Sequence, residues 1–386
     1  MFSKAARSQA AKPFRIGVLN DQSASTAVAS GKGTIAAIEL AIEDFGGSVL
    51  GRPIELISAD HQNKVDVATS VAREWLDVRG VEAIIDLQNS AVALAVIPLV
   101  QKANKVAIAC TVSSTDVSGK ACTPISFHWI YDNYALARVM PKTVVGQGKK
   151  KWFLLNPDYA AGISIERELI KALGEYGATV VGKTRHPLGA TEFSSVLLTA
   201  QHSGAEVIQI GAASSDLVNE VRQVKEFGID HDHLIATTAM SIVDVHSLGL
   251  EATSGLLASE AFYWDLDDKT RAWTKRFVKK MGIPATMWQA GNYSAALHYL
   301  KSVAAAGTSE GLKVAQAMKS ALIDDMMGTN IKIRADGRVV RDMHLFRVKT
   351  PKESKYAFDY YERIATAPGS ELVVPVSESE CALIRS

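Results

Sequence analysis

The chain has 386 residues, 47% of them hydrophobic, and this length predicts two domains because a single core rarely grows beyond about 250–300 residues. Its 42 Lys and Arg residues almost balance its 41 Asp and Glu residues, and no basic stripe with interleaved aromatic residues occurs, so we expect no nucleic-acid partner. The sequence contains no apolar run of about 18 residues, so we also expect no stable insertion into a membrane.

The N-terminal segment, residues 1–12, is basic and rich in small residues but lacks the apolar stretch of a complete secretory signal. We interpret it as a disordered segment or the remnant of a signal peptide, so the sequence alone does not establish export. The three cysteines, Cys110, Cys122 and Cys381, lack the spacing of metal ligands and allow at most one disulfide bond.

The first predicted unit spans residues 14–47. Residues 14–19 form a short buried strand, residues 20–30 a polar loop, and the apolar residues from Ile35 to Phe45 recur at helical spacing until Gly46 and Gly47 end the helix. Ligands of open α/β sheets bind at the carboxyl ends of the strands, so this loop is predicted to lie at the binding site.

The same unit recurs along the chain. Further strands are predicted at 54–59, 83–87 and 106–109, and a second series at 152–155, 179–181, 207–210 and 234–236. After a connecting strand at 255–261 we expect helices at 268–281, 288–306 and 311–323, then a hairpin of 331–334 and 339–348. Alternating strands and helices predict parallel sheets, so the fold class is α/β with two similar Rossmann-like lobes joined by a hinge.

No catalytic or metal-binding pattern stands out. Residues 31–36, GKGTIA, match the G-x-G-x-x-A dinucleotide fingerprint, but 11 residues separate them from the first strand, whereas the fingerprint should form the strand-to-helix turn itself. An NAD-dependent oxidoreductase therefore remains only as an alternative function, of a different class from ligand binding. His231 and His233 lie in a polar turn, and no G-x-S-x-G motif occurs, so we expect no enzyme, no cofactor and no metal.

Polar residues follow the predicted strands of both lobes. Asn89 and Ser90 follow one strand of the first series, and Tyr159 follows the first strand of the second. Two such edges that face each other form a cleft, and hydroxyl groups with helix N-termini can bind a small polar or anionic molecule there.

In its motifs the chain resembles the solute-binding proteins of ABC importers of the branched-chain amino acid (Leu/Ile/Val-binding) type, which have the type I periplasmic-binding-protein fold. The resemblance runs from about residue 13 to the C-terminus and rests on the order and spacing of GVLNDQSAS, LAIEDFGGSVLGRPIELISADHQNK, DLQNSAVALAV and NPDYAAG. It implies a periplasmic, monomeric binding protein with a small-molecule ligand and an ABC permease as partners. A cytoplasmic ligand-sensing domain of the same fold remains a further alternative.

The resemblance also implies how the chain divides. We assign residues 13–133 and 260–338 to the first lobe, on which the ligand docks, and residues 134–259 and 339–386 to the second, closing lobe. A subgroup with ADHQNK, GKAC-P-FHW and a terminal SESEC implies a disulfide between Cys122 and Cys381, which would return the C-terminal tail to the first lobe and leave Cys110 as a thiol.

Matching the family motifs gives a predicted binding set. In the family the groups at Asn89, Ser90, Val112 and Ser113 hold the ligand carboxylate. The full set of predicted ligand-binding residues is Asp21, Ser23, Asn89, Ser90, Val112, Ser113, Ser114, Tyr159, Ala161, Ala213, Met240 and Trp288.

The departures from the family pattern indicate the chemical class of the ligand. Ala24 and Thr26 replace a glycine and an aromatic residue, and Ala161 and Ala213 also stand where the family has aromatic residues. The acid that holds an α-ammonium group would fall near Met240, but residues 237–242 contain no acid. Burying an unpaired ammonium ion is very costly, so we expect a small carboxylate such as an aromatic acid, with Met240 and Trp288 as walls. A branched-chain or other amino acid or amide is the alternative.

Overall fold

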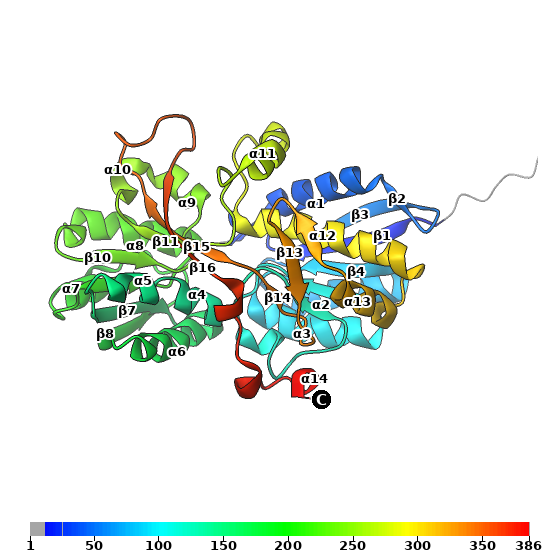
Figure 1. The fold of residues 1–386 in the computed structure, drawn as a ribbon, viewed down its shortest axis with the longest axis horizontal. Coiled ribbons are helices and arrows are strands. Elements are labelled where there is room, and N and C mark those ends of the chain that lie inside the picture. Colours follow the sequence, from blue (N-terminus) through cyan, green and yellow to red (C-terminus); the bar gives the residue numbers. More distant parts are fainter. Residues whose placement is uncertain (1–11, 25, 386) are drawn as a thin grey trace, which may run out of the picture.

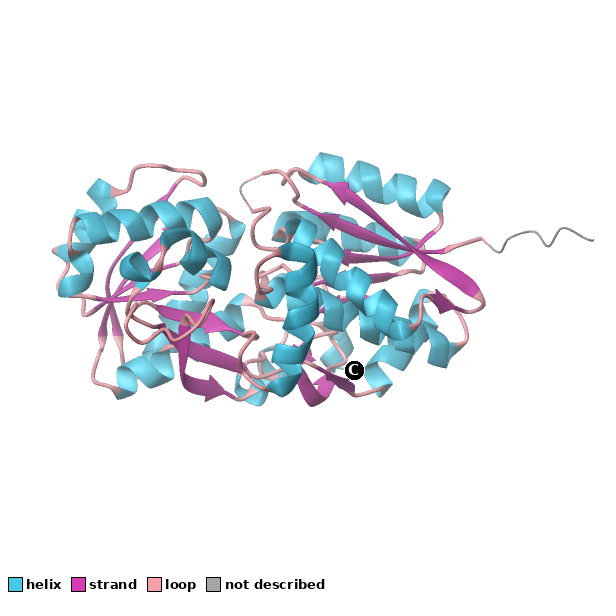
Figure 2. Ribbon diagram, turned by 90° about the horizontal axis from the view of Figure 1, so that it is seen from above, coloured by secondary structure: helices cyan, strands magenta, loops and turns pink. Residues whose placement is uncertain are grey.

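The computed structural model describes residues 12–24 and 26–385, so all but the last residue of the predicted N-terminal segment 1–12 lies outside it. The described chain forms two α/β lobes side by side (Figures 1 and 2), each built around its own sheet. This arrangement confirms the predicted fold class. Within the described residues, no helix has the length and apolar content that crossing a membrane requires.

The first lobe contains a six-stranded sheet in the order β2-β3-β1-β4-β5-β6. All neighbouring strands are parallel except β2 and β3. Its strands are β1 (Phe14–Asn20), β2 (Ser48–Val49), β3 (Arg52–Asp60), β4 (Val81–Asp86), β5 (Val106–Ala109) and β6 (Ser126–His128). Its helices are α1 (Gly31–Phe45), α2 (Val65–Glu74), the π-helix η1 (Trp75–Arg79), α3 (Ser90–Lys102), the 3-10 helix η2 (Thr115–Val117), α11 (Asp268–Met281), α12 (Met287–Ala306) and α13 (Gly311–Ser320).

Close packing explains two features of this lobe. Trp75, at the start of η1, lies against β1 at Gly17, where a Cβ atom would approach its ring to 2.4 Å. Helix α12 is buried on nearly all sides and packs against α1, and a capping box of Thr286 and Gln289 fixes its first turn. This cap places Trp288 at the end of α12 that points to the second lobe.

The second lobe contains a seven-stranded sheet in the order β16-β15-β11-β10-β9-β7-β8, in which β15 is antiparallel to both its neighbours. Its strands are β7 (Lys151–Pro157), β8 (Thr179–His186), β9 (Val207–Ile210), β10 (Leu234–Thr237), β11 (Leu257–Glu260), β15 (Met343–Val348) and β16 (Tyr361–Ala367). Its helices are α4 (Asn133–Val139), α5 (Pro141–Gly146), α6 (Ala160–Glu175), α7 (Ser194–Gln201), α8 (Ser214–Glu226), the 3-10 helix η3 (Ile229–His231), α9 (Ile242–Leu248) and α10 (Leu250–Thr253).

The predicted strand 339–348 is wrong as one element. Residues Val339–Val340 form β14, which pairs with β13 (Gly328–Ile333) in a small sheet completed by β12 (Ile323–Asp325). The chain then crosses to the second lobe, where β15 joins the larger sheet. Burial alternates through this crossing because the charged Arg341 is itself buried, and only Arg341 and Asp342 separate the two apolar strands. A two-residue charged interruption does not distinguish a crossing from a kink within one strand.

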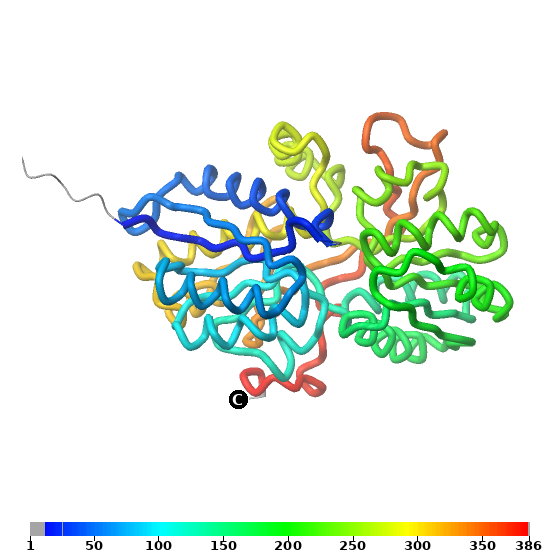
Figure 3. Tube along the Cα trace, turned by 180° about the vertical axis from the view of Figure 1, so that it is seen from behind, coloured from blue at the N-terminus to red at the C-terminus, as the bar shows by residue number. Residues whose placement is uncertain are grey.

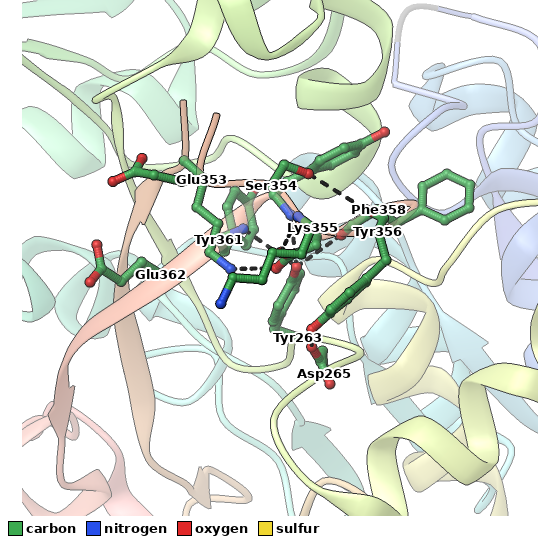
Figure 4. A network of polar contacts seen from close by, with 12 residues as sticks. Tyr263, Asp265, Glu353, Ser354, Lys355, Tyr356, Phe358, Tyr361 and Glu362 are labelled. Atoms are coloured by element: carbon green, nitrogen blue, oxygen red, sulfur yellow. Dashed lines mark hydrogen bonds and ion pairs between the residues drawn. The ribbon is translucent and has the colours of Figure 1, made fainter. Parts of the chain in front are cut away.

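Between β1 and β16 the described chain passes between the lobes three times, at residues 129–132, 261–267 and 341–342. A tyrosine network holds the second crossing to the β15–β16 loop (Figure 4). The Phe358 carbonyl accepts hydrogen bonds from the Tyr263 hydroxyl and the Trp264 indole, each at 2.9 Å, and the Tyr356 hydroxyl donates to Asp265 at 2.5 Å. The loop of the second lobe therefore braces the connection to the first.

The C-terminal tail crosses back to the first lobe (Figure 3). It contains the 3-10 helices η4 (Gly369–Glu371) and η5 (Val376–Glu378) and ends with α14 (Ala382–Arg385). A disulfide joins Cys381 to Cys122 with a Cα–Cα distance of 5.7 Å, and Cys110 is a buried thiol. This is the pairing that the resemblance implies.

Candidate ligand-binding cleft

A cleft of about 110 Å³ lies between the two lobes at the carboxyl ends of their strands. Of the predicted residues, seven line it: Asn89, Ser90, Ser113, Tyr159, Ala161, Ala213 and Trp288. The sequence-based set omitted other lining residues, among them Asn63, Gln88, Thr111, Tyr131, Asn133, Ser214 and Thr238. Several of these lie one to three residues after a strand, as Gln88 does after β4 and Thr238 after β10, which is a signal that could have found them.

Hydrogen bonds fix the first-lobe wall of the cleft. Asn89 has a left-handed backbone with φ 80°, and its side chain caps α3 by accepting from the Ala91 N–H at 2.8 Å. Its amide group donates to Asn63 at 2.8 Å, and the Ser90 hydroxyl accepts from the Ser114 N–H at 3.2 Å. The polar groups after β4 and β5 are therefore held in place before any ligand arrives.

A buried carboxylate lies behind this wall. Asp86 is fully buried and accepts hydrogen bonds from Asn20 at 3.0 Å, Thr111 at 2.5 Å and Asn292 at 3.1 Å. These partners come from β1, the loop after β5 and α12, so one side chain joins three elements of the first lobe. The sequence analysis missed this role, because a lone aspartate at a strand end has no distinguishing pattern.

The second-lobe wall offers backbone donors. Helices α6 and α8 begin at the cleft, and their N-cap residues are Tyr159 and Ala213. Among the described residues, no side chain caps either helix. The first N–H groups of a helix have no partner within it, so these two uncapped termini can donate to a ligand.

The electrostatics of the cleft favour an anion. Among the described residues that line it, none has a charged side chain. Helices α3, α6 and α8 all direct their N-termini to it, and each carries partial positive charge there. A cationic group would meet positive helix ends with no carboxylate on the described lining.

Asp244, the first acid after the acid-free stretch 237–242, has another role. The Asp244 carboxylate accepts from the Ser241 N–H at 2.8 Å and from the Ser241 hydroxyl at 2.7 Å, and so caps α9. Burial raises the pKa of Asp244 to about 6 despite these bonds. Asp244 does not line the cleft, so it does not replace the missing acid.

Five predicted residues are absent from the described cleft lining: Asp21, Ser23, Val112, Ser114 and Met240. Met240 is fully buried in the core of the second lobe, so its expected role as a wall was wrong, and the neighbouring Thr238 and Ala239 line the cleft instead. The Val112 carbonyl is 2.8 Å from the His128 ring nitrogen Nε2, and the Ser114 hydroxyl caps η2.

The Asp21 carboxylate fixes the conformation of the loop after β1. Its buried carboxylate accepts from the N–H groups of Ser23, Ala24 and Thr26 at 2.7–3.2 Å and from the Thr26 hydroxyl at 2.7 Å. The Ser23 hydroxyl donates to Asp60 at 2.5 Å. Asp21 therefore bonds within the loop and Ser23 bonds to the end of β3, and it is Thr26 that lines the cleft.

Comparison with known proteins agrees with this geometry. The chain matches the family model described as periplasmic binding protein over residues 13–355. A periplasmic binding protein from Burkholderia mallei is 41% identical with a TM-score of 0.92, and the match covers 97% of this chain and 99% of that one. A branched chain amino acid ABC transporter periplasmic ligand-binding protein from Burkholderia xenovorans is 39% identical with a TM-score of 0.89, covering 96% and 100%.

More distant matches share the fold. A solute-binding protein of an ABC transporter from R. palustris, solved in complex with benzoate, has a TM-score of 0.84 at 18% identity, covering 96% of this chain and 100% of that one. Leu/Ile/Val-binding protein homolog 6 of Brucella abortus is 24% identical over 208 residues, 53% of this chain and 52% of that protein. The match therefore spans about half the length of the curated relatives.

The family and these neighbours are binding proteins of transporters and not enzymes. This finding confirms the expectation of a non-enzymatic protein and leaves the dinucleotide alternative without support. With two α/β lobes, a cleft between them and a family match over most of its length, the chain belongs to the periplasmic binding protein family.

Proposed function

We propose that this chain is the extracytoplasmic solute-binding component of an ABC importer, and that its ligand is a small carboxylate without an α-ammonium group, an aromatic acid in the first place. The observation that carries the proposal is the cleft lining, which has three helix N-termini and no charged side chain among its described residues. Hydroxyl and N–H donors can bind a carboxylate, whereas a buried ammonium ion without a partner costs several kcal/mol.

The aromatic rings of the cleft support an apolar ligand body. Tyr131, Tyr159 and Trp288 line it together with Leu136 and Ile165. The Tyr159 side chain is neutral at physiological pH, because the usual pKa of a tyrosine hydroxyl is about 10. A fold neighbour from R. palustris binds benzoate, which shows that this architecture can accept such an acid.

The proposed mechanism is closure of the lobes over the ligand. The ligand docks on the first lobe at Asn89, Ser90 and Ser113, and the uncapped ends of α6 and α8 complete the site from the second lobe. Closure shifts the population toward a state that a membrane permease recognises, which requires tighter binding of the ligand to that state. The Cys122–Cys381 disulfide fits an oxidising compartment such as the periplasm, where we expect the protein to act as a monomer.

Paired ligands test the proposal. Leucine and 4-methylpentanoate differ only in the α-ammonium group, as do phenylalanine and 3-phenylpropanoate. We expect the acids to raise the thermal unfolding midpoint and the amino acids to leave it unchanged, because only a ligand that binds the folded state stabilises it. A rise with leucine and none with its acid would overturn the ligand class and favour an amino acid, as the description of the Burkholderia xenovorans relative suggests.

A further inference from the structure

Two aromatic side chains meet at the edge of the cleft near the first crossing between the lobes. Tyr131 belongs to that crossing, and Trp288 lies in the first turn of α12. The indole N–H of Trp288 donates to the Tyr131 hydroxyl oxygen at 2.9 Å. Both residues line the cleft although they are buried, with exposed fractions of 6% for Tyr131 and 3% for Trp288.

In this hydrogen bond the Tyr131 hydroxyl serves only as an acceptor. An indole N–H can only donate, so the Tyr131 oxygen is the acceptor and its own O–H remains a donor. Among the described residues, none accepts a hydrogen bond from that O–H, and the Trp288 contact is its only side-chain hydrogen bond. Leaving a buried donor unpaired costs about 1–3 kcal/mol, so a ligand atom that accepts this bond would be favoured.

The protonation state keeps Tyr131 a donor. Burial raises the pKa of its hydroxyl well above the usual value, and the hydrogen bond from Trp288 offsets this only in part. The group therefore stays neutral and protonated across physiological pH. It complements an oxygen acceptor, whereas an ammonium group would place donor against donor.

We propose that the Tyr131 hydroxyl, oriented by the Trp288 indole, donates a hydrogen bond to an acceptor oxygen of the bound ligand and so selects acceptors over cationic donors at this end of the cleft. This inference rests on the proposed function, since it assumes that the ligand occupies the cleft. It assigns a specificity role to a residue that the sequence analysis did not single out.

Removal of one oxygen atom tests this role. Tyr131→Phe keeps the ring and deletes the donor, and Tyr134→Phe is the matched control, because Tyr134 lies three residues further on and outside the described cleft lining. The probes are 4-methylpentanoate, 3-phenylpropanoate, leucine and phenylalanine, and titration calorimetry uses whichever binds the wild-type protein most tightly. We expect Tyr131→Phe to weaken binding about tenfold or more, as for a hydrogen bond to a charged group, and Tyr134→Phe to leave it unchanged.

The outcomes separate the two proposals. Near-ultraviolet circular dichroism first checks that Tyr131→Phe is folded. If an acid binds the wild-type protein and the variant loses less than about twofold in affinity, the role of Tyr131 is refuted while the proposed function stands. If leucine or phenylalanine binds most tightly, the ligand class fails, and selection against an ammonium group fails with it. If no probe binds, both proposals are rejected for these ligands. A crystal structure of the protein with the bound acid should place a ligand oxygen about 2.5–3.0 Å from the Tyr131 oxygen.

Discussion

Arg338 and Asp132 form a buried ion pair that links the first crossing between the lobes to the strand before the third. The Arg338 Nε atom lies 3.0 Å from Asp132 Oδ2, and the side chains are only 4% and 2% exposed. Asp132 ends the first crossing and caps α4 through the Ala135 N–H at 2.8 Å, while Arg338 directly precedes β14 and the third crossing. A buried ion pair therefore holds the hinge together in addition to the chain segments that cross it.

Removal of one partner of this pair should destabilise the protein strongly. Asp132→Asn removes the carboxylate that pairs with the buried guanidinium of Arg338, and breaking a buried ion pair typically costs about 3–5 kcal/mol. Chemical denaturation measures the change. The control is Glu371→Gln, which breaks the Lys142–Glu371 pair, whose side chains are 60% and 47% exposed, and should cost less than about 1 kcal/mol. Equal effects of the two substitutions would show that the hinge pair contributes no more than a surface pair.

Loss of the disulfide should lower stability without changing the fold. Cys122 and Cys381 are 259 residues apart, and removal of a native disulfide typically costs about 2–5 kcal/mol. We expect Cys122→Ser with Cys381→Ser to unfold at lower denaturant concentration than the wild type. A reductant should bring the wild type to the same midpoint and leave the double variant unchanged. If the reductant shifts the double variant equally, its effect does not act through this bond.

Most of the architecture could be predicted from the sequence because its strands are local and strongly patterned. The strand Phe14–Asn20 and the helix that Gly46 caps can be predicted without tertiary information, since a run of mostly apolar residues marks the strand and a glycine marks the end of the helix. The break between β14 and β15 could not be predicted, because only two residues, Arg341 and Asp342, separate the strands and the sequence does not show that they join different sheets.

The cleft could be predicted only in part. Ser90 and Ser113 lie shortly after the ends of β4 and β5, so strand ends identify them. Tyr131 could not be found this way, because the short strand β6, which ends three residues before it, was not among the predicted strands. Met240 was placed in the cleft by sequence position, but its side chain turns into the core, and sequence position does not fix side-chain direction.

A methyl group at Gly211 should disturb the second-lobe wall. Gly211 lines the cleft, and a Cβ atom there would lie 1.9 Å from the Asn156 side-chain oxygen, which is fully buried and has no room to shift freely. We expect Gly211→Ala to weaken binding of the acid at least tenfold and to lower the unfolding midpoint.

Gly174→Ala is the matched control for this substitution. Gly174 lies inside α6, with no atom within 4 Å of a new Cβ atom, so alanine should stabilise the protein by about 0.5–1 kcal/mol and leave binding unchanged. Calorimetric titration and thermal unfolding of both variants measure these effects. Unaltered binding in Gly211→Ala would show that the Asn156 side chain can move without affecting the site.

The buried carboxyl of Asp244 should make stability depend on pH. Burial raises its pKa from 3.8 to about 6, so the folded state holds a proton that the unfolded state releases at lower pH. Its contribution is therefore fully present below the unfolded pKa and is lost as the pH rises through about 6, by on the order of 1–3 kcal/mol. Asp244→Asn mimics the neutral form and keeps an oxygen that accepts from the Ser241 N–H, so its stability should fall less than that of the wild type between about pH 4.5 and pH 7.5.

Unfolding free energies measured across this range give the comparison, and parallel curves for the two proteins would show that Asp244 does not titrate there. Glu220, whose pKa burial raises to about 7, is unchanged in both proteins and so cancels in the difference.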